Sequence, residues 1–133
     1  MLPAPSMREL PASVVLPAPR FRYSPVVVAG GFAFVSGMVG LDAATGKLAE
    51  GGAYGESRQV LANLRALLAE QSWSLEQIVA ARLYCADFAQ FGEVNRAWDE
   101  CFASVAPPAR TSIGVAALPL GAQVEMEFQL IVA

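Results

Sequence analysis

The sequence predicts an α+β fold in which two helices pack on one face of a mixed β-sheet. Strand-like segments occupy both ends of the chain, two segments with helical periodicity lie between them, and an apolar strand separates the two helices. The length of 133 residues matches one domain with a core of its own. The order of three strands, helix, strand, helix and two strands therefore indicates a two-layer sandwich.

An irregular arm is expected at residues 1–22, before a single domain at 23–133. The arm carries five of the nine prolines and shows little periodicity, so it holds at most one edge strand near Ser13–Leu16. Met7 is a second candidate for the start of the chain. The opening residues lack a basic segment followed by an apolar one, so no secretory signal is expected.

The first paired strands are expected at 26–29 and 32–36. Both segments are rich in Val, Phe and Ala, and Gly30-Gly31 between them tolerates the positive φ of a tight hairpin turn. Residues 25–41 form an uncharged run, but glycines interrupt it and it is short for a membrane span. We therefore expect a soluble, cytoplasmic protein that does not bind membranes.

Two amphipathic helices are expected. The first spans 53–71, where Glu56, Arg58, Arg65 and Glu70 occupy positions outside an apolar stripe. The second follows a capping signature at 87–90 and ends before two prolines. The expected buried stripes are Val60, Leu61, Leu64, Leu67 and Leu68 in the first helix, and Phe91, Val94, Trp98, Cys101 and Phe102 in the second.

Three more strands complete the predicted sheet. Ser74 and Gln77 resemble a capping box that opens a short helical turn before the strand at 79–86, which is apolar on both faces apart from Arg82 and therefore typical of an interior strand. The last strands are expected at 111–117 and 124–132. In the final strand Val124 and every second residue after it point one way, and the other face carries Glu125, Glu127 and Gln129.

The composition excludes several kinds of site. The chain has no histidine, so it cannot form a histidine-based catalytic triad or an imidazole metal site, and Cys85 and Cys101 alone cannot bind zinc. We expect both cysteines to be reduced core residues. The net charge of -3 argues against nucleic-acid binding. With 55% hydrophobic and 16% charged residues, the chain has more apolar material than one small domain buries, which suggests a subunit interface.

Arg110 and Glu125 are the strongest candidates for chemistry. Arg110 follows a rigid Pro-Pro-Ala segment at the start of a strand, where a fixed guanidinium can hold a carboxylate through two hydrogen bonds. In a water-poor pocket the two side chains could bind a small carboxylic acid and direct a water molecule at it. Each also has an ordinary explanation, because Arg110 could be a surface ion-pair residue and Glu125 could belong to a solvated strand face.

The two residues are not expected to meet within one subunit. If the last two strands form a simple hairpin around 119–121, Arg110 lies opposite roughly position 130, some 16 Å from Glu125 at ~3.3 Å per residue. A shared site therefore implies that neighbouring subunits contribute one residue each.

Five segments resemble, in order and spacing, the RidA (YjgF) family of enamine/imine deaminases, and the resemblance covers about residues 23–132. The segments are Phe34-Val35-Ser36-Gly37, Gln59-Val60-Leu61-Ala62-Asn63-Leu64, Phe91-Gly92-Glu93-Val94-Asn95, Pro108-Ala109-Arg110-Thr111 and 118–127. The resemblance implies chorismate-mutase-like (RidA-like) subunits that assemble as a homotrimer around a central barrel, with clefts between neighbours. It also implies hydrolysis of reactive 2-imino or 2-enamino acids to 2-oxo acids and ammonia, with no cofactor or metal.

Residue roles follow from matching positions in this family. The resemblance implies that Arg110 binds the substrate carboxylate and that Glu125 positions or activates the attacking water. It implies that the pocket is shaped by Tyr23, Ser36, Gly37, Asn95, Thr111 and Ser112, the last of which stands where many members have a cysteine. Tyr23 could instead anchor the arm, Ser36-Gly37 could be a strand end, and Asn95 could be a surface amide.

Departures from the family pattern leave the substrate and the role open. They include Met38, Gly40 and Gly114, and the segment 21–25 also differs from the common Gly-Pro-Tyr-Ser-Gln. The substrate could therefore be a specialised imino acid, including an aminomuconate-type compound. A non-catalytic trimeric protein that binds small carboxylates is the alternative function, and it would need Arg110 but not Glu125. The acidic balance and the missing histidine disfavour a ribonuclease.

Overall fold

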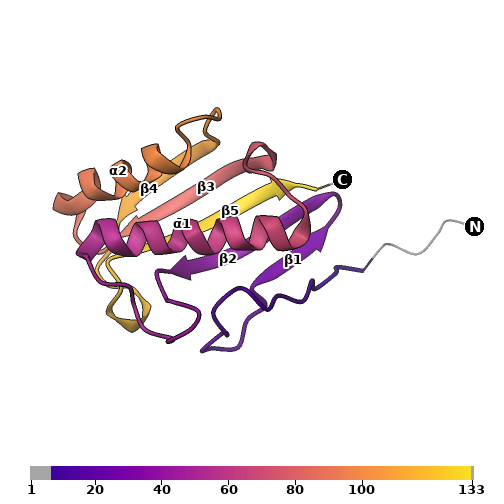
Figure 1. Cartoon of the computed structure of the whole chain (residues 1–133), viewed down its shortest axis with the longest axis horizontal. Helices are drawn as coiled ribbons and strands as arrows, with labels where there is room; N and C mark the ends of the chain where they lie inside the picture. Colours follow the sequence, from indigo (N-terminus) through magenta and orange to yellow (C-terminus); the bar gives the residue numbers. More distant parts are fainter. Residues whose placement is uncertain (1–6, 133) are drawn as a thin grey trace, which may run out of the picture.

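The computed structural model describes residues 7–132 and contains a five-stranded mixed sheet with strand order β1-β2-β5-β3-β4. Two helices lie on one face of this sheet (Figure 1), as the sequence predicts. The strands are β1 (Val26–Ala29), β2 (Phe32–Val39), β3 (Ile78–Cys85), β4 (Ala109–Gly114) and β5 (Val124–Ile131). The helices are α1 (Gly52–Gln71) and α2 (Phe91–Cys101), and short 3-10 turns span Leu75–Gln77, Phe88–Gln90 and Pro119–Gly121.

The predicted hairpin at the start of the sheet is confirmed. β1 pairs antiparallel with β2, and Gly30 and Gly31 between them have φ of 60° and 82°. Positive φ at both central residues is the requirement of the tight turn that matches the twist of a hairpin. β2 continues to Val39, three residues beyond the predicted end, because its far half pairs with β5.

Local capping also follows the sequence. Asp87 accepts a hydrogen bond from the Ala89 backbone N–H at 3.1 Å, and this contact opens the turn that leads into α2. Ser74 and Gln77 form the predicted capping box, in which the Ser74 backbone N–H donates to Gln77 Oε1 at 2.7 Å. These contacts fix where β3 and α2 begin.

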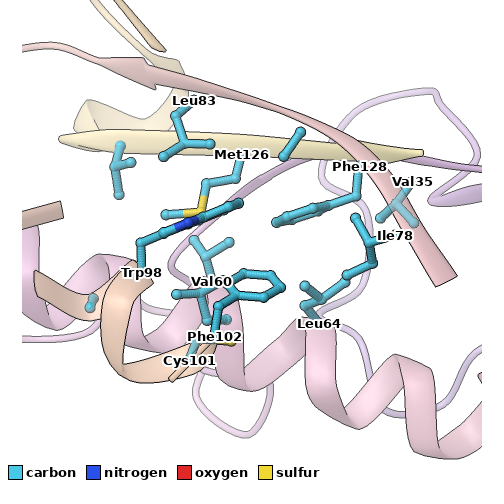
Figure 2. Packing of buried hydrophobic residues seen from close by; sticks show 14 of the residues in the cluster. Val35, Val60, Leu64, Ile78, Leu83, Trp98, Cys101, Phe102, Met126 and Phe128 are labelled. Carbon is cyan, nitrogen blue, oxygen red and sulfur yellow. The ribbon is translucent and has the colours of Figure 1, made fainter. Parts of the chain in front are cut away.

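The core lies between the sheet and the helices (Figure 2). Phe128 of β5 stacks on Trp98 of α2, with ring centroids 6.4 Å apart and planes inclined by 6°. Leu64 of α1 is fully buried in the same cluster. Each such side chain contributes roughly 1.5–3 kcal/mol through removal of apolar surface from water. Cys85 and Cys101 are buried and free, as predicted.

The position of Glu56 differs from the prediction. The sequence placed it outside the apolar stripe of α1, but it is 5% exposed. Its Oε1 accepts a hydrogen bond from the Gln123 backbone N–H at 2.9 Å, just before β5 begins. A buried carboxylate needs such a partner, and helical periodicity alone could not reveal a partner so distant in sequence.

The pairing of β4 also differs from the hairpin considered above. β4 runs parallel to β3, with Ala81 opposite Arg110, and β3 separates β4 from β5. α2 is the crossover between β3 and β4, and such a connection favours parallel neighbours. The segment 115–123 is also longer than the roughly 2–5 residues of common hairpin loops. β4 therefore lies at an edge of the sheet.

The arm forms no strand at Ser13–Leu16, where the sequence allowed at most one edge strand. Among residues 7–22, pairing with the sheet is a single bridge in which Glu9 and Val28 exchange backbone hydrogen bonds of 2.8 and 2.9 Å. The prolines limit longer pairing because each removes a backbone donor. The first part of the predicted arm, including Met1, lies outside the described residues. Neither helix within residues 7–132 has the length and apolar character needed to cross a lipid bilayer.

Candidate active site

A β-bulge in β2 creates one side of the candidate site. Val35 pairs with Phe128 and Met38 pairs with Met126, so Ser36 and Gly37 together stand opposite a single residue of β5. Bulges of this kind bend a strand and redirect its side chains, and they occur often beside active sites. Ser36 Oγ donates a hydrogen bond to the Ser24 carbonyl oxygen at 2.6 Å, which connects the bulge to the short segment between the arm and β1.

Gly37 lies directly against Glu125. A Cβ atom added at Gly37 would be 2.3 Å from Glu125 Oε1 and 2.9 Å from its carboxyl carbon. No other residue type leaves room for the carboxylate in this position. The bulge in β2 and the polar face of β5 therefore place the Glu125 carboxylate against the backbone of Gly37.

A cavity of about 400 Å³ opens beside this carboxylate. Glu125, Gly37, Ser36 and Tyr23 line it, so the structure brings together four of the residues that the sequence singled out. The arm closes another side with Leu16, Pro17, Ala18, Arg20 and Phe21, and further walls come from Met38, Val39, Leu41, Asn63, Pro119, Leu120 and Glu127. The site therefore lies where β2 and β5 meet the arm and the loop before β5.

The electrostatics of the cavity favour a proton-accepting carboxyl group. Burial raises the pKa of Glu125 above its usual value, and the nearby charge of Glu127 raises it further. Burial also raises the pKa of Tyr23, with a smaller contribution from the charge of Glu125. Within residues 7–132 no protein donor hydrogen-bonds to the Glu125 carboxylate, which is therefore available to a water molecule or a ligand.

Glu127 has protein partners, unlike Glu125. The Tyr84 hydroxyl donates a hydrogen bond to Glu127 Oε1, and an Arg82 nitrogen lies 4.0 Å from the same oxygen. The two carboxylates therefore differ in role although they alternate on one strand face. Glu127 is held by β3, and it contributes negative charge to the site.

Arg110 lies away from this cavity. Ala81, which stands opposite Arg110, is buried beneath the helices, so Arg110 points toward α2. Its guanidinium carbon lies 5.1 Å from the centre of the Trp98 ring and 5.5 Å from that of Phe91, within the range of cation–π contacts. Within residues 7–132 it forms no ion pair. An exposed, oriented guanidinium thus stands at the edge of the sheet.

Arg110 and Glu125 do not meet within the protomer. Tyr84 stands opposite Glu125 and Ala81 opposite Arg110, so the two residues are three positions apart along β3 and on either side of it. The offset is ~10 Å along the strand and about 10 Å across it, and the two side chains project from opposite faces of the sheet. The prediction that one chain does not join them is confirmed, although the reason is the strand order and not a hairpin.

Asn95, Thr111 and Ser112 are also outside the cavity. Asn95 is half-buried on α2, while Thr111 stands opposite Arg82 and Ser112 opposite Leu83 on the edge strand. Ser112 Oγ is buried, and no atom within residues 7–132 forms a hydrogen bond with it. These residues share the β4–α2 edge with Arg110. The predicted site is therefore divided between two places on the molecule.

Comparison with known proteins assigns the family. Residues 14–132 match the sequence model of the family described as Endoribonuclease L-PSP. The crystal structure of RidA from a Psychrobacter species is 30% identical and superimposes with a TM-score of 0.86, covering 93% of this chain and 99% of that one. The chain belongs to the RidA (YjgF) family.

Relatives within the RidA family carry two kinds of name. A RutC family protein of Aquifex aeolicus is 39% identical over 123 residues, which cover 91% of this chain and 96% of that protein. The 2-iminobutanoate/2-iminopropanoate deaminase of Mus musculus is 35% identical over 121 residues, covering 91% of this chain and 89% of the mouse protein. The family is thus established by sequence and by structure.

Several lining residues of this RidA-family site were not predicted. Leu16 and Phe21 belong to the arm, whose irregular sequence gave no sign of which side chains turn toward the sheet. Leu120 has φ of 62° in the turn before β5, a left-handed conformation that costs a non-glycine residue ~1–2 kcal/mol. Leucine gives no sequence signal for that conformation.

The site contains no evident metal-binding cluster. Nowhere in residues 7–132 do three or more His, Cys, Asp or Glu side chains converge as metal ligands would. Asn63 at the cavity wall is already engaged, since its side-chain amide donates to the Leu41 carbonyl oxygen at 2.9 Å and its Oδ1 accepts from Gln59. The group best placed to act on a ligand is therefore the carboxylate of Glu125.

Proposed function

We propose that this protein is a hydrolytic deaminase of 2-imino or 2-enamino acids, which it converts to 2-oxo acids and ammonia. The observation that carries the proposal is the Glu125 carboxylate, which has no hydrogen-bond or ion-pair partner within residues 7–132 and lies against Gly37 in a mostly apolar cavity. The mouse relative named 2-iminobutanoate/2-iminopropanoate deaminase supports the same reaction class. The residues that line the cavity include no histidine or cysteine, so we assign the proton transfers to the Glu125 carboxylate and water.

The proposed reaction needs little more than orientation and proton transfer. A protonated imine carbon is already electrophilic, so water held by Glu125 adds to it and gives up a proton to the carboxylate. In the resulting carbinolamine, Glu125 returns that proton to the nitrogen, the C–N bond breaks and ammonia leaves. The hydroxyl oxygen becomes the carbonyl oxygen by giving its proton to the Glu125 carboxylate, and ammonia then takes that proton away as ammonium. A raised pKa suits Glu125 for these transfers.

Arg110 of a neighbouring copy would bind the substrate carboxylate. The guanidinium is exposed, oriented by Trp98 and Phe91, and without an ion-pair partner within residues 7–132. Its distance from Glu125 in the protomer requires that the two come from different copies. Bidentate binding of a carboxylate by arginine would then fix the imine carbon near the water.

An assembly of copies, a homotrimer in our proposal, is supported by the sheet face opposite the helices. No helix covers this face within residues 7–132, and Phe32, Phe34 and Ile113 on it are 40–45% exposed. Exposed apolar patches of this kind mark protein interfaces. The proposed trimer would bury this face and bring the β4 edge of one copy to the cavity of the next.

The charge of the cavity makes RNA cleavage, the activity in the family's description, a poorer fit. Glu125 and Glu127 both line the site, and Arg20 is the one cation among the lining residues. A phosphodiester would be repelled by the carboxylates, and RNA-binding surfaces depend on clustered positive charge. A 2-imino acid with a protonated imine is zwitterionic, so its zero net charge meets no such barrier.

The test is a hydrolysis assay on imino acids generated by an amino-acid oxidase. The wild-type protein should accelerate 2-oxo acid release, and Glu125→Ala should remove about 10²–10⁴-fold of that acceleration. The Glu125→Ala variant should still bind the 2-oxo acid product, measured by calorimetry, because Arg110 is intact. Glu76→Gln, at an exposed carboxylate in the turn before β3, is the matched control and should retain full activity.

The same assay separates the enzyme from a carboxylate-binding protein. Unchanged turnover in Glu125→Ala would exclude the mechanism. Binding of 2-oxo acids without acceleration of any imine would instead favour the non-catalytic function.

A further inference from the structure

We infer that the cavity beside Glu125 receives a large apolar substituent of the substrate and that Leu120 is a specificity-determining residue. The preferred substrates would then be 2-imino acids derived from amino acids such as leucine or phenylalanine. This inference rests on the proposed function and adds the substrate class to it.

The size of the cavity is the first support. About 400 Å³ lies beside the carboxylate, room for roughly a dozen water molecules at about 30 Å³ each. It also falls in the range of roughly 300–1,000 Å³ typical of pockets that hold drug-sized ligands. The smallest imino acids would leave most of this space to water. A bulky side chain would fill it.

The lining of the cavity is the second support. Apart from Glu125 and Tyr23, most side chains that line the cavity are aliphatic or aromatic. The largest of them are Leu16, Pro17, Phe21, Met38, Leu41 and Leu120. The guanidinium of Arg20 donates a hydrogen bond to the Gly46 carbonyl oxygen and is therefore engaged by the protein. The carboxylates of Glu125 and Glu127 disfavour an acidic substituent.

The backbone of Leu120 is the third support. Leu120 and Ser72 are the two non-glycine residues with positive φ within residues 7–132. Glycine would satisfy this conformation without strain, so a leucine here is explained by what its side chain contacts. That side chain lines the cavity and is 41% exposed, which leaves it free to pack against a ligand. Backbone strain that persists at a pocket of this kind is typical of functional positions.

The experiment compares kcat/KM for imines derived from alanine, leucine, phenylalanine and glutamate. Wild-type protein should prefer the leucine and phenylalanine imines to the alanine imine by at least roughly tenfold, the discrimination that a hydrophobic pocket gives for each methylene. Leu120→Gly should lower the leucine-to-alanine ratio by about tenfold or more. Its melting temperature should stay the same or rise, because glycine relieves the positive φ.

Ser72→Gly is the matched control. It relieves the same conformation, φ 60°, at the end of α1 and outside the cavity, so it should leave the selectivity ratio unchanged. Phe21→Ser provides a second test from the arm, where the backbone is not strained, and it should also lower the ratio. It covers the case in which Leu120→Gly folds poorly.

The outcomes separate this inference from the proposed function. Equal or better turnover of the alanine imine, or a preference for the glutamate imine, would overturn the inference while leaving the deaminase intact. No acceleration of any imine would overturn the proposed function itself. A ratio that falls equally in Ser72→Gly would assign the effect to backbone strain and reject the role of the Leu120 side chain.

Discussion

The two halves of the candidate site are completed to different degrees within one protomer. At the β2–β5 bulge, Gly37 and Glu125 touch, and the arm encloses a cavity beside them. At the β4–α2 edge, Arg110 is oriented by two aromatic rings but faces no carboxylate within residues 7–132. The fold of one chain therefore builds the half that we propose to direct water, and in our proposal the half that binds the substrate carboxylate depends on how copies assemble.

Mixing two inactive variants tests this division most directly. Arg110→Gln and Glu125→Gln should each reduce deaminase activity about 10²-fold or more. If each site takes one residue from each of two neighbouring copies, co-refolding the variants at equal amounts should restore about a quarter of the wild-type sites by random pairing. The measurement is imine hydrolysis by the mixture and by each variant alone.

The control for mixing is the double variant Arg110→Gln/Glu125→Gln combined with wild-type protein under the same conditions. In that mixture a site is intact only where two wild-type copies meet, so its activity should fall to about a quarter of the wild-type value, below the half expected from dilution alone. If the mixture of the two single variants is no more active than either variant alone, the site is not shared between copies.

The contact between Gly37 and Glu125 gives a second prediction, confined to the bulge. Gly37→Ala would place a methyl group 2.3 Å from Glu125 Oε1 and displace the carboxylate. Misplacement of a catalytic group by about 1 Å can cost 10²-fold in rate, so we expect a loss of roughly 10–10²-fold in kcat/KM. Gly92→Ala is the matched control, because apart from its own helix backbone and chain neighbours no heavy atom of residues 7–132 lies within 4 Å of its added Cβ.

Gly92 lies in α2, where alanine favours the helix by about 1 kcal/mol over glycine. The control should therefore be slightly more stable and fully active. Wild-type rates in Gly37→Ala would show that the observed position of Glu125 is not the one used for catalysis.

The sequence allowed the layers of the fold to be predicted more fully than the site. Periodicity located both helices, and the Gly30-Gly31 and Asp87 signals located a turn and a cap, because these features depend on neighbours in sequence. The pairing of β4 with β3 was missed, since strand order depends on the crossover through α2. The burial of Glu56 was missed for the same reason, because its partner is at position 123.

In the candidate site, too, the residues set by local patterns were predicted and those set by distant contacts were missed. The alternation along β5 placed Glu125 and Glu127 on one face, which is a local property. The cavity walls from Leu16, Phe21 and Leu120 arise from an arm and a turn without periodicity, so no pattern in the sequence pointed to them. Contacts between irregular segments and distant parts of the chain are therefore the hardest to predict from one sequence, because these segments have no periodicity.

The smallest expected effect is a pH dependence of stability that arises from the raised pKa of Glu125. It tests only the part of the site at the β2–β5 bulge. Burial and Glu127 raise this pKa above 4.5, so the folded protein binds the proton more tightly than the unfolded chain does. The corresponding stability is fully present below pH 4.5 and is lost as the pH rises through the folded value. Glu125→Gln, which mimics the neutral form, should therefore stabilise the protein more at pH 8 than at pH 5, by about 1 kcal/mol or less.

Urea unfolding of both proteins at the two pH values measures this difference. Glu56 is also buried with a raised pKa, so the wild-type and variant proteins should share its contribution, and only their difference reports Glu125. Activity should change in the opposite direction, falling as the pH drops through the folded pKa, because a protonated carboxyl cannot accept a proton from water. If the change in the free energy of unfolding caused by Glu125→Gln is the same at both pH values, Glu125 titrates as an ordinary solvated glutamate. The cavity would then lack the water-poor character on which its proposed chemistry depends.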